Sequence, residues 1–298
     1  MKFAIAYNVK SGRGSAPHIA KQLIAALAAK GHSASLVNAP DVESMRGALA
    51  ALAKDESISA IVSVGGDGLA HLVINACAHT RIPMYTVPAG TGNDFARTNN
   101  QVSTDIDFIT DRLTTEAPVE IDLGLIRFQR DGIARHEYFG QVLSTGFDSL
   151  VNKRANRMKW IRGQMKYNIS TLLELPLFRP IEYELELDGT TISLSAMLVA
   201  VANGPTYGGG MKILPEANRR DGELDLLLLK PVSKIELLRV FPRVFKGTHV
   251  THPAVEIFRS KKIALRAKAL AYADGEYISS LPIEISIAPK ALRTWEAA

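Results

Sequence analysis

Residues 62–75 read VSVGGDGLAHLVIN, and this stretch decides the fold of the first part of the chain. The apolar residues before the glycines predict a buried strand, and the pattern after them predicts a helix. Gly65, Gly66 and Gly68 carry no β-carbon, so a phosphate chain can approach the backbone N–H groups of the turn, where the positive end of the helix also points. Asp67 is then expected to hold a cation or a hydroxyl. A tight strand–helix turn capped by Asp67 is the alternative.

The composition indicates a globular protein. The chain has 298 residues, enough for one large or two ordinary domains, and 47% of them are hydrophobic and 22% charged. The single cysteine, Cys77, lies on the apolar face of the helix that follows the GGDG turn. We therefore expect a core residue rather than a nucleophile, and a single cysteine fits a reducing compartment.

The charge and the hydropathy leave two classes of partner open and exclude a membrane span. A net charge of +5 and a pI of about 9.2 permit attraction to an anionic lipid surface or to nucleic acid. The first residues form too short an apolar stretch for a signal peptide, and no window holds the ~20 apolar residues that a span needs. We expect a soluble, cytoplasmic protein that reaches any lipid from outside the membrane.

The first third of the chain alternates strands and helices. This pattern, with nearly continuous apolar strands, predicts a parallel sheet covered on both faces. The glycine-bearing loops at 11–14, 65–68 and 90–92 follow strands, so we expect them at the carboxyl ends, where such sheets bind ligands. The predicted strands are 3–8, 33–38, 58–64 and 83–87, and the predicted helices are 17–30, 43–54 and 69–79.

After about Pro118 the pattern becomes that of an antiparallel β-sandwich. Asp131-Gly132 and Gly189 each separate two strand-like runs, a strong hairpin signal. The expected strands are 119–130, 135–144, 181–188, 191–202, 223–229, 255–259, 262–266 and 283–288, with helices at about 149–175 and 233–246. The sequence therefore predicts an α/β protein of two domains. They are an α/β nucleotide domain (1–118 plus roughly 289–298) and a β-rich sandwich domain (119–288).

Two further loops of the first domain carry polar groups. The segment Asn8–Gly14, NVKSGRG, can present N–H groups to a phosphate but matches neither a Walker loop nor a dinucleotide fingerprint, and a surface turn is the alternative. The loop after the fourth strand, PAGTGNDFAR (88–97), offers the Thr91 hydroxyl. Asn93 and Asp94 join the candidate site, although capping of the next helix explains them equally.

In the second domain, two acidic turns are candidates for metal or proton chemistry. Asp221 and neighbouring carbonyl groups can hold a cation such as Mg²⁺, with a plain turn as the alternative. Asp274 and Glu276 flank a glycine, which fits proton abstraction together with metal binding, although a hairpin turn explains the motif alone. The basic stretch 153–166, with Trp160, indicates either a solvated helix face or contact with an anionic membrane. No zinc motif and no G-x-S-x-G elbow occurs.

Taken in this order, the motifs resemble the diacylglycerol kinase catalytic family, the bacterial soluble lipid kinases related to sphingosine kinase and NAD kinase. The matching blocks cover nearly the whole chain, and their combination is specific. They are NVKSGRG (8–14), GGDG (65–68), PAGTGNDFAR (88–97), EIDLG (120–124), STGFD (144–148), YGGGM with the following PEANRRDGEL (207–224), and DGE (274–276).

The resemblance implies ATP-dependent phosphorylation of a lipid hydroxyl with Mg²⁺, in a cleft between two domains. The implied roles group the candidate residues by function. ATP would be surrounded by Asn8, Lys10, Ser11, Gly12, Gly65, Gly66, Gly68, Thr91 and Asn93, while Asp67 and Asp94 would organise phosphates and catalytic cation. Glu276 resembles the family's proton acceptor, with Asp274 beside it. Asp221, helped by carbonyl groups near Asn218 and Glu223, resembles the ligand of a structural Mg²⁺. Asp122 resembles a residue that ties that site to the cleft.

The sequence departs from the family pattern beside the nucleotide loops. Val9 stands where proline is usual, Leu69 replaces threonine, and His71-Leu72 replaces an Asn-Glu pair. Each lost polar contact can cost about 1–3 kcal/mol if its partner stays buried and unmet. His71 can compensate as a donor.

The expected activity is phosphorylation of diacylglycerol to phosphatidate. A kinase for a sphingoid or polyprenol, a catalytically weakened lipid- or nucleotide-binding protein, and an NAD kinase are the alternatives. The expected partners are ATP and a lipid substrate at a membrane surface, which the protein would visit peripherally. No nucleic acid is expected, and a homodimer is left open.

Overall fold

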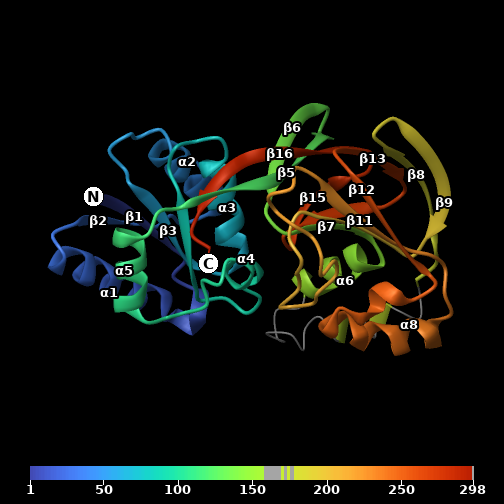
Figure 1. Cartoon of the computed structure of the whole chain (residues 1–298), viewed down its shortest axis with the longest axis horizontal. Helices are drawn as coiled ribbons and strands as arrows, with labels where there is room; N and C mark the ends of the chain where they lie inside the picture. Colours follow the sequence, from blue (N-terminus) through green and yellow to red (C-terminus); the bar gives the residue numbers. More distant parts are fainter. Residues whose placement is uncertain (158–168, 171–172, 175–177, 297–298) are drawn as a thin grey trace. The chain divides into compact units, whose positions relative to one another are not determined.

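The structure is a computed structural model that describes residues 1–157, 169–170, 173–174 and 178–296 (Figure 1). Its contacts divide the chain into two compact units. The first unit comprises Met1–Ile121 together with Lys290–Ala298, and the second comprises Asp122–Pro289.

The first unit is a parallel sheet with helices packed against it. Its strands follow the order β2-β1-β3-β4, with Ile5 opposite Val62 and Val62 opposite Tyr85. Every residue of β3 is buried, which explains its continuous apolar sequence. The elements are β1 (Lys2–Tyr7), η1 (Ser11–Gly14), α1 (Ala16–Ala29), β2 (Ser33–Val37), α2 (Val42–Leu52), β3 (Ala60–Gly65), α3 (Asp67–Cys77), β4 (Met84–Pro88), α4 (Asp94–Thr98) and α5 (Ile106–Thr115).

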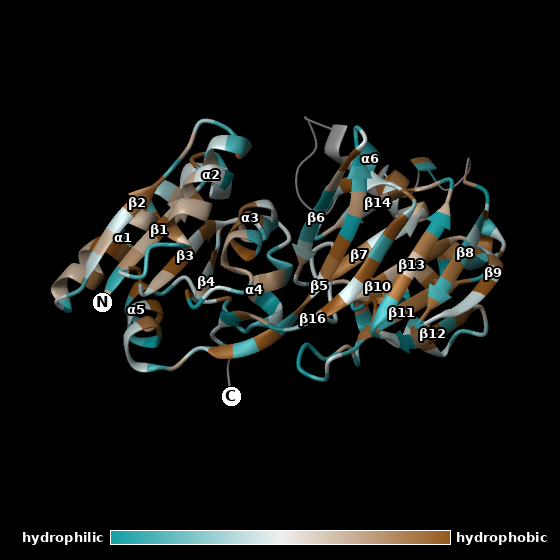
Figure 2. Cartoon of the chain, turned by 90° about the horizontal axis from the view of Figure 1, so that it is seen from above, coloured by the Kyte–Doolittle hydropathy of each residue, from teal (hydrophilic) through white to brown (hydrophobic). Residues whose placement is uncertain are grey.

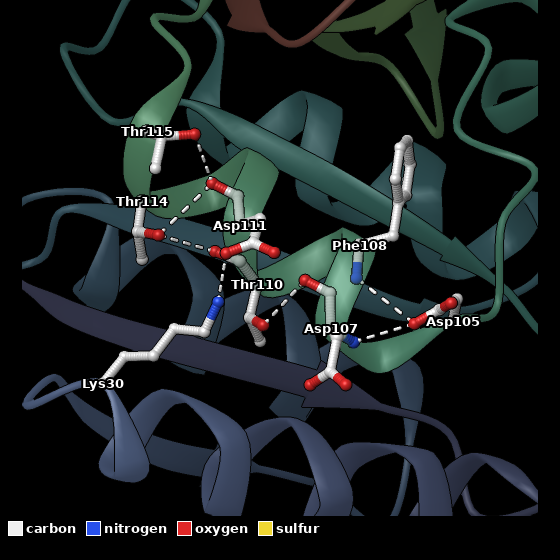
Figure 3. A network of polar contacts seen from close by, with 8 residues as sticks. All are labelled: Lys30, Asp105, Asp107, Phe108, Thr110, Asp111, Thr114 and Thr115. Carbon is white, nitrogen blue, oxygen red and sulfur yellow. Dashed lines mark hydrogen bonds and ion pairs between the residues drawn. The ribbon is translucent and has the colours of Figure 1, made fainter.

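Helix α5 shows how local polar contacts fix an element of this unit (Figure 3). The Asp105 carboxylate caps the helix by accepting hydrogen bonds from the N–H groups of Asp107 (3.0 Å) and Phe108 (3.2 Å). Further along the helix, Asp111 pairs with Lys30, which follows the last residue of α1. This pair links α5 to α1.

The second unit is an antiparallel β-sandwich. One of its sheets follows the order β12-β11-β10-β7-β14-β15, and the other contains β16, β13, β8 and β9 with the β5–β6 hairpin. The elements are β5 (Val119–Arg130), β6 (Ile133–Phe139), β7 (Val142–Gly146), α6 (Phe147–Arg157), β8 (Ile181–Leu187), β9 (Thr190–Ala196), β10 (Leu198–Ala202), β11 (Leu224–Leu229), α8 (Lys234–Val240), η2 (Phe241–Lys246), η3 (Thr248–Thr251), β12 (Val255–Ser260), β13 (Lys262–Ala267), β14 (Leu270–Ala273), β15 (Glu276–Ser280) and β16 (Ile283–Thr294). The predicted fold class, a parallel α/β part followed by an antiparallel sandwich, is confirmed.

The apolar cores follow the strand patterns. Figure 2 shows β3 mostly in the hydrophobic colour, whereas hydrophilic and hydrophobic residues mix along β8. In β8 the side chains of Tyr183 and Leu185 are buried and those of Glu182 and Glu184 are exposed, as the alternation predicts. Among the described helices, none combines the length and the apolarity needed to cross a bilayer.

Two predicted strands are wrong in one respect, because each is split in two. The run 135–144 divides into β6 and β7, and the run 191–202 divides into β9 and β10. In both cases the two halves belong to different sheets of the sandwich. The apolar pattern continues through the second break at Met197, so it does not mark that change of sheet, whereas Gly140 and Gln141 stand at the first break. The predicted helix 149–175 is described only in part, as α6 and a few later residues.

Candidate active site

Three glycine-bearing loops meet at the carboxyl ends of β1, β3 and β4, which are neighbours in the sheet. The contact between two of these loops is very close. A β-carbon added to Gly90 would lie 2.4 Å from the Cα atom of Gly66, and one added to Gly12 would lie 3.3 Å from the carbonyl oxygen of Ala89. The glycines at 66 and 90 are therefore required for loop–loop packing, whatever else they bind.

Asp67 is the residue that joins the GGDG turn to the loop after β4. Its two carboxylate oxygens accept hydrogen bonds from the backbone N–H groups of Asn93 (2.8 Å) and Asp94 (2.7 Å). These N–H groups begin helix α4, which has no side-chain cap of its own. Asp67 therefore caps a helix 26 residues further along the chain, rather than its own turn.

Asn93 fixes the shape of the loop after β4 from inside. It has the left-handed conformation with φ +54°, its Oδ1 accepts from the Gly90 N–H (2.9 Å), and its Nδ2 donates to the Gly90 carbonyl oxygen (3.0 Å). Asp94 is buried, whereas Thr91 is exposed at the tip of the loop. The hydrogen bonds of Asn93 thus fix the loop, at whose tip Thr91 is accessible.

The loop after β1 is ordered by its own turn. The Asn8 side chain accepts a hydrogen bond from the Lys10 N–H (2.9 Å), and the Ser11 N–H donates to the Asn8 carbonyl oxygen (3.0 Å). Gly12 has φ +60°, which a residue with a β-carbon adopts rarely. Asn8, Lys10 and Gly12 are exposed, so this loop also has groups that a ligand can contact.

Helix α3 begins at Asp67, two residues earlier than the sequence predicts. The first turn of a helix has N–H groups without intrahelical acceptors, and here Gly66 provides no side-chain cap. Leu69 packs against Gly65 and is buried. His71 is 2% exposed, and its Nε2 lies 3.3 Å from the Asn75 Nδ2, so its ring is buried in the protein rather than exposed to solvent.

Asp274 in the second unit, like Asp67 in the first, accepts hydrogen bonds from consecutive backbone N–H groups. Its carboxylate accepts hydrogen bonds from the backbone N–H groups of Gly140 (2.8 Å), Gln141 (2.9 Å) and Val142 (3.3 Å). These residues form the break between β6 and β7. Asn203 supports the same break by donating to the carbonyl oxygen of Gly140 at 3.1 Å. Asp274 therefore holds the point at which the chain changes sheet.

Glu276 is exposed, in contrast to the bonded carboxylate of Asp274. It is the first residue of β15, directly after the Asp274-Gly275 turn, in which both residues have positive φ (+50° and +85°). The hairpin that the DGE motif permits is thus present. The turn directs the chain so that a fixed carboxylate is followed, two residues later, by an accessible one.

The acidic loop 218–225 is arranged around an arginine. Arg259 of β12 lies opposite Asp225 of β11, and its Nε is 3.1 Å from Asp225 Oδ1. The same guanidinium also pairs with Asp221 and lies 3.4 Å from Glu223 Oε2. Burial raises the pKa of Asp225, an effect that the positive charge of Arg259 opposes.

The oxygens of Asp221 are already used in this arrangement. One accepts from Arg259 and the other from the Glu223 N–H at 3.1 Å, while the Asn218 carboxamide accepts from the Arg220 N–H at 3.1 Å. Among the described residues, no group of three or more His, Cys, Asp or Glu side chains is placed to hold a metal ion. In this arrangement Arg259 neutralises the carboxylates that the structural Mg²⁺ implied by the resemblance would contact, and that Mg²⁺ site stays a prediction.

Asp122 connects this loop to the start of the sandwich. Its carboxylate accepts from the Gly222 N–H at 2.9 Å, and its carbonyl oxygen accepts from the Asn203 amide at 2.9 Å. Since Asn203 also holds the β6–β7 break, the acidic loop and the DGE turn belong to one hydrogen-bond network. All the residues of this network lie within the second unit.

An apolar cavity lies within the second unit, under α8 and η2. Nearly all of its lining is aliphatic or aromatic, so the cavity is chemically suited to a hydrocarbon chain. The lining residues are Phe147, Val151, Leu198, Tyr207, Gly208, Met211, Ile213, Leu227, Leu229, Leu237, Val240, Phe241, Val244, Phe245, His249 and Val255. Burial lowers the pKa of His249, which favours its neutral form in this surrounding.

The fold and these loops define a class of protein, and the comparison with protein families agrees. The diacylglycerol kinase catalytic domain matches residues 2–126, and the YegS C-terminal NAD kinase beta sandwich-like domain matches residues 141–296. The chain therefore belongs to the diacylglycerol kinase family, and the protein is a kinase. The resemblance inferred from the motifs is confirmed.

The most similar relatives include two bacterial diacylglycerol kinases. The enzyme of Mycobacterium tuberculosis strain H37Rv is 39% identical over 96% of this chain and 92% of its own length. That of Bacillus subtilis strain 168 is 28% identical over 94% of this chain and 91% of its own length. These relatives match this chain across both of its units.

Two solved structures share the fold. A diacylglycerol kinase from Bacillus anthracis strain Sterne has a TM-score of 0.71 at 19% identity, covering 99% of this chain and 97% of that one. A yeast NADH kinase has a TM-score of 0.54 at 11% identity, covering 100% of this chain and 84% of that one.

Sequence reasoning missed two features of the site. It assigned Asp67 to a ligand, whereas its hydrogen bonds to Asn93 and Asp94 need a contact between distant loops. It also missed Arg259, although strand pairing places this residue opposite Asp225 of β11. The predicted basic stretch 153–166 lies mostly outside the described residues; within the stretch, Arg154 pairs with Glu174.

Proposed function

We propose that the protein transfers the γ-phosphoryl group of ATP, supplied with Mg²⁺ as the nucleotide complex, to the hydroxyl group of diacylglycerol. The observation that supports ATP as the phosphoryl donor is the meeting of three glycine-bearing loops at the ends of β1, β3 and β4. Backbone N–H groups at such loops and helix N-termini suit a polyphosphate. Thr91, Lys10 and the first turn of α3 are the groups that we assign to the nucleotide.

The assignment of a lipid as the phosphoryl acceptor is supported by an accessible carboxylate and by an apolar cavity. The lipid hydroxyl oxygen would form a bond to the γ-phosphorus while the bond to the β-phosphate oxygen breaks and ADP leaves. Glu276 would take the hydroxyl proton, with Asp274 as the residue that fixes its turn. The apolar cavity of the second unit supports a hydrocarbon-bearing acceptor, since its lining offers little to a polar one.

Transfer of labelled γ-phosphate from ATP into a total lipid extract tests this function. Label in phosphatidate is the expected result. Label in another lipid would favour a sphingoid or polyprenol acceptor, and label in a soluble product would favour a nucleotide acceptor such as NAD. No labelled product at all would favour a binding protein, the outcome that Leu69 and Leu72 motivate.

Glu276→Gln tests the role of the proton acceptor. Because general-base catalysis contributes about 10²–10⁴-fold, turnover should fall by that factor. ATP affinity, measured by calorimetry, should stay within about twofold of that of the unchanged protein. Glu284→Gln is the matched control, since Glu284 is also an exposed strand residue of the second unit. Full turnover in Glu276→Gln would refute this role.

A further inference from the structure

The segment 234–246, which comprises α8 and η2, has two apolar faces. Its inner face is formed by Leu237, Val240 and Val244, which are buried and line the apolar cavity. A helix on the surface of a soluble unit ordinarily carries polar residues on its other face. This one does not.

The outer face of this segment exposes large aliphatic side chains. Ile235 is 63% exposed and Leu238 is 44% exposed, and their spacing of three residues places them on one side of α8. Arg239 and Lys246 are exposed with them. Aliphatic residues bordered by cations on one helix face are typical of helices that lie in the membrane interface.

The net charge of the segment is positive. Residues 234–246 contain four cations, Lys234, Arg239, Arg243 and Lys246, against a single carboxylate, Glu236. The Oε1 atom of that carboxylate lies 3.2 Å from His252 Nε2, and the Glu236 side chain is 45% exposed. The segment is therefore complementary to an anionic surface rather than to a cationic one.

We propose that α8 and η2 form the surface by which the protein docks on an anionic bilayer. Ile235 and Leu238 enter the acyl boundary, and Arg239 and Lys246 contact the lipid phosphates. The inner face of the same segment lines the apolar cavity, so a docked segment lies between the bilayer and that cavity. The assignment of this partner rests on the proposed function, because a diacylglycerol acceptor resides in a membrane.

Vesicle flotation tests the surface without nucleotide and without diacylglycerol. The probes are vesicles of phosphatidylcholine alone and vesicles with 30% phosphatidylglycerol, a composition chosen on the order of that of an anionic membrane. The unchanged protein should bind the second kind more tightly.

Ile235→Asn with Leu238→Asn should lower the partition coefficient by about tenfold or more. Arg239→Gln with Lys246→Gln should lower it by about fivefold per charge at low salt, and high salt should remove that difference.

Matched controls separate this surface from any exposed apolar or basic residue. Ile133→Asn changes another exposed isoleucine of the second unit, 57% exposed, and Arg266→Gln removes another exposed cation. Both controls should bind vesicles like the unchanged protein. Equal binding by the Ile235/Leu238 variant and the unchanged protein, or an equal loss in Ile133→Asn, would overturn the proposal. Thermal unfolding of each variant checks that the fold is retained.

The same variants distinguish the failure of this inference from that of the proposed function. A short-chain, water-soluble diacylglycerol can be phosphorylated without a bilayer. The Ile235/Leu238 variant should turn over this substrate at the normal rate but lose at least tenfold on vesicle-embedded diacylglycerol. Normal activity on vesicles in this variant would refute the docking surface alone. Vesicle binding through α8 without phosphorylation of any lipid would refute the function alone.

Discussion

At the scale of single residues, two aspartates that motif analysis assigns to chemistry hold backbone segments together. Asp67 accepts from the N–H groups that begin α4, and Asp274 accepts from those at the β6–β7 break. Such charge-assisted bonds to consecutive N–H groups fix a loop in one conformation. The two carboxylates can therefore position their neighbours, Asp94 and Glu276, more directly than they can contact a substrate.

The position of these aspartates could be predicted from the sequence, but their partners could not. GGDG and DGE stand out because glycine next to an acid is a local signal. The bond from Asp67 to Asp94 spans 27 residues and that from Asp274 to Gly140 spans 134. Contacts of this length depend on which strands become neighbours, and no local pattern records that.

Gly90→Ala tests the packing of the nucleotide loops. The added β-carbon would lie 2.4 Å from the Gly66 Cα, a backbone atom that cannot turn away. We expect a loss of about 1–3 kcal/mol in the free energy of unfolding, measured in urea, and weaker ATP binding.

Gly47→Ala is the control for this change. Gly47 lies within α2 with nothing within 4 Å of an added β-carbon, so alanine should stabilise by about 0.5–1 kcal/mol. A Gly90→Ala protein as stable as the unchanged one, with unaltered ATP affinity, would show that the loops are not packed this closely.

At the scale of elements, turn chemistry is the most reliable signal in this chain. The hairpins β5–β6, β8–β9 and β14–β15 all turn at Asp-Gly pairs, and in each pair both residues have positive φ. The primed turns that such pairs favour match the twist of the strands. The limits of strands are less predictable, because β9 passes into β10 at Met197 with no polar residue to mark the change of sheet.

Arg259→Ala tests whether an internal cation replaces a metal ion between β11 and β12. In the unchanged protein a chelator should not shift the melting temperature, because Arg259 already neutralises the acidic loop. In Arg259→Ala the carboxylates of Asp221, Glu223 and Asp225 lose their common partner. The melting temperature in chelator should then fall by about 2–4 °C, and millimolar Mg²⁺ should restore part of it.

Arg266→Ala is the control for this test. Arg266 is as exposed as Arg259, at 48%, and also pairs with two carboxylates, Glu184 and Glu186. Any effect of Mg²⁺ elsewhere in the protein should appear equally in this variant. A chelator that destabilises the unchanged protein as much as Arg259→Ala would indicate a resident metal ion.

At the scale of the whole molecule, the last residues of the chain complete the first unit. Strand β16 pairs with β13 of the second unit through Ile283–Ser286, and its end pairs with β4 at Thr294 opposite Met84. Trp295 then packs edge-to-face on Tyr85, with the ring centroids 5.8 Å apart. The first unit therefore folds around residues that are nearly 200 positions distant in the chain.

Trp295→Ala tests this closure. The Trp295 side chain is 3% exposed, and its Nε1 donates to the carbonyl oxygen of Glu116 at 3.0 Å. Its removal leaves a cavity and an unmet acceptor, so we expect a loss of about 3–5 kcal/mol in urea unfolding followed by circular dichroism. Phe108→Ala removes an aromatic ring of the same unit that is 48% exposed, and it should cost far less. Because the nucleotide loops belong to this unit, ATP binding should be lost at a lower urea concentration in Trp295→Ala than in the control. Equal unfolding of the two variants would mean that the first unit closes without the end of the chain.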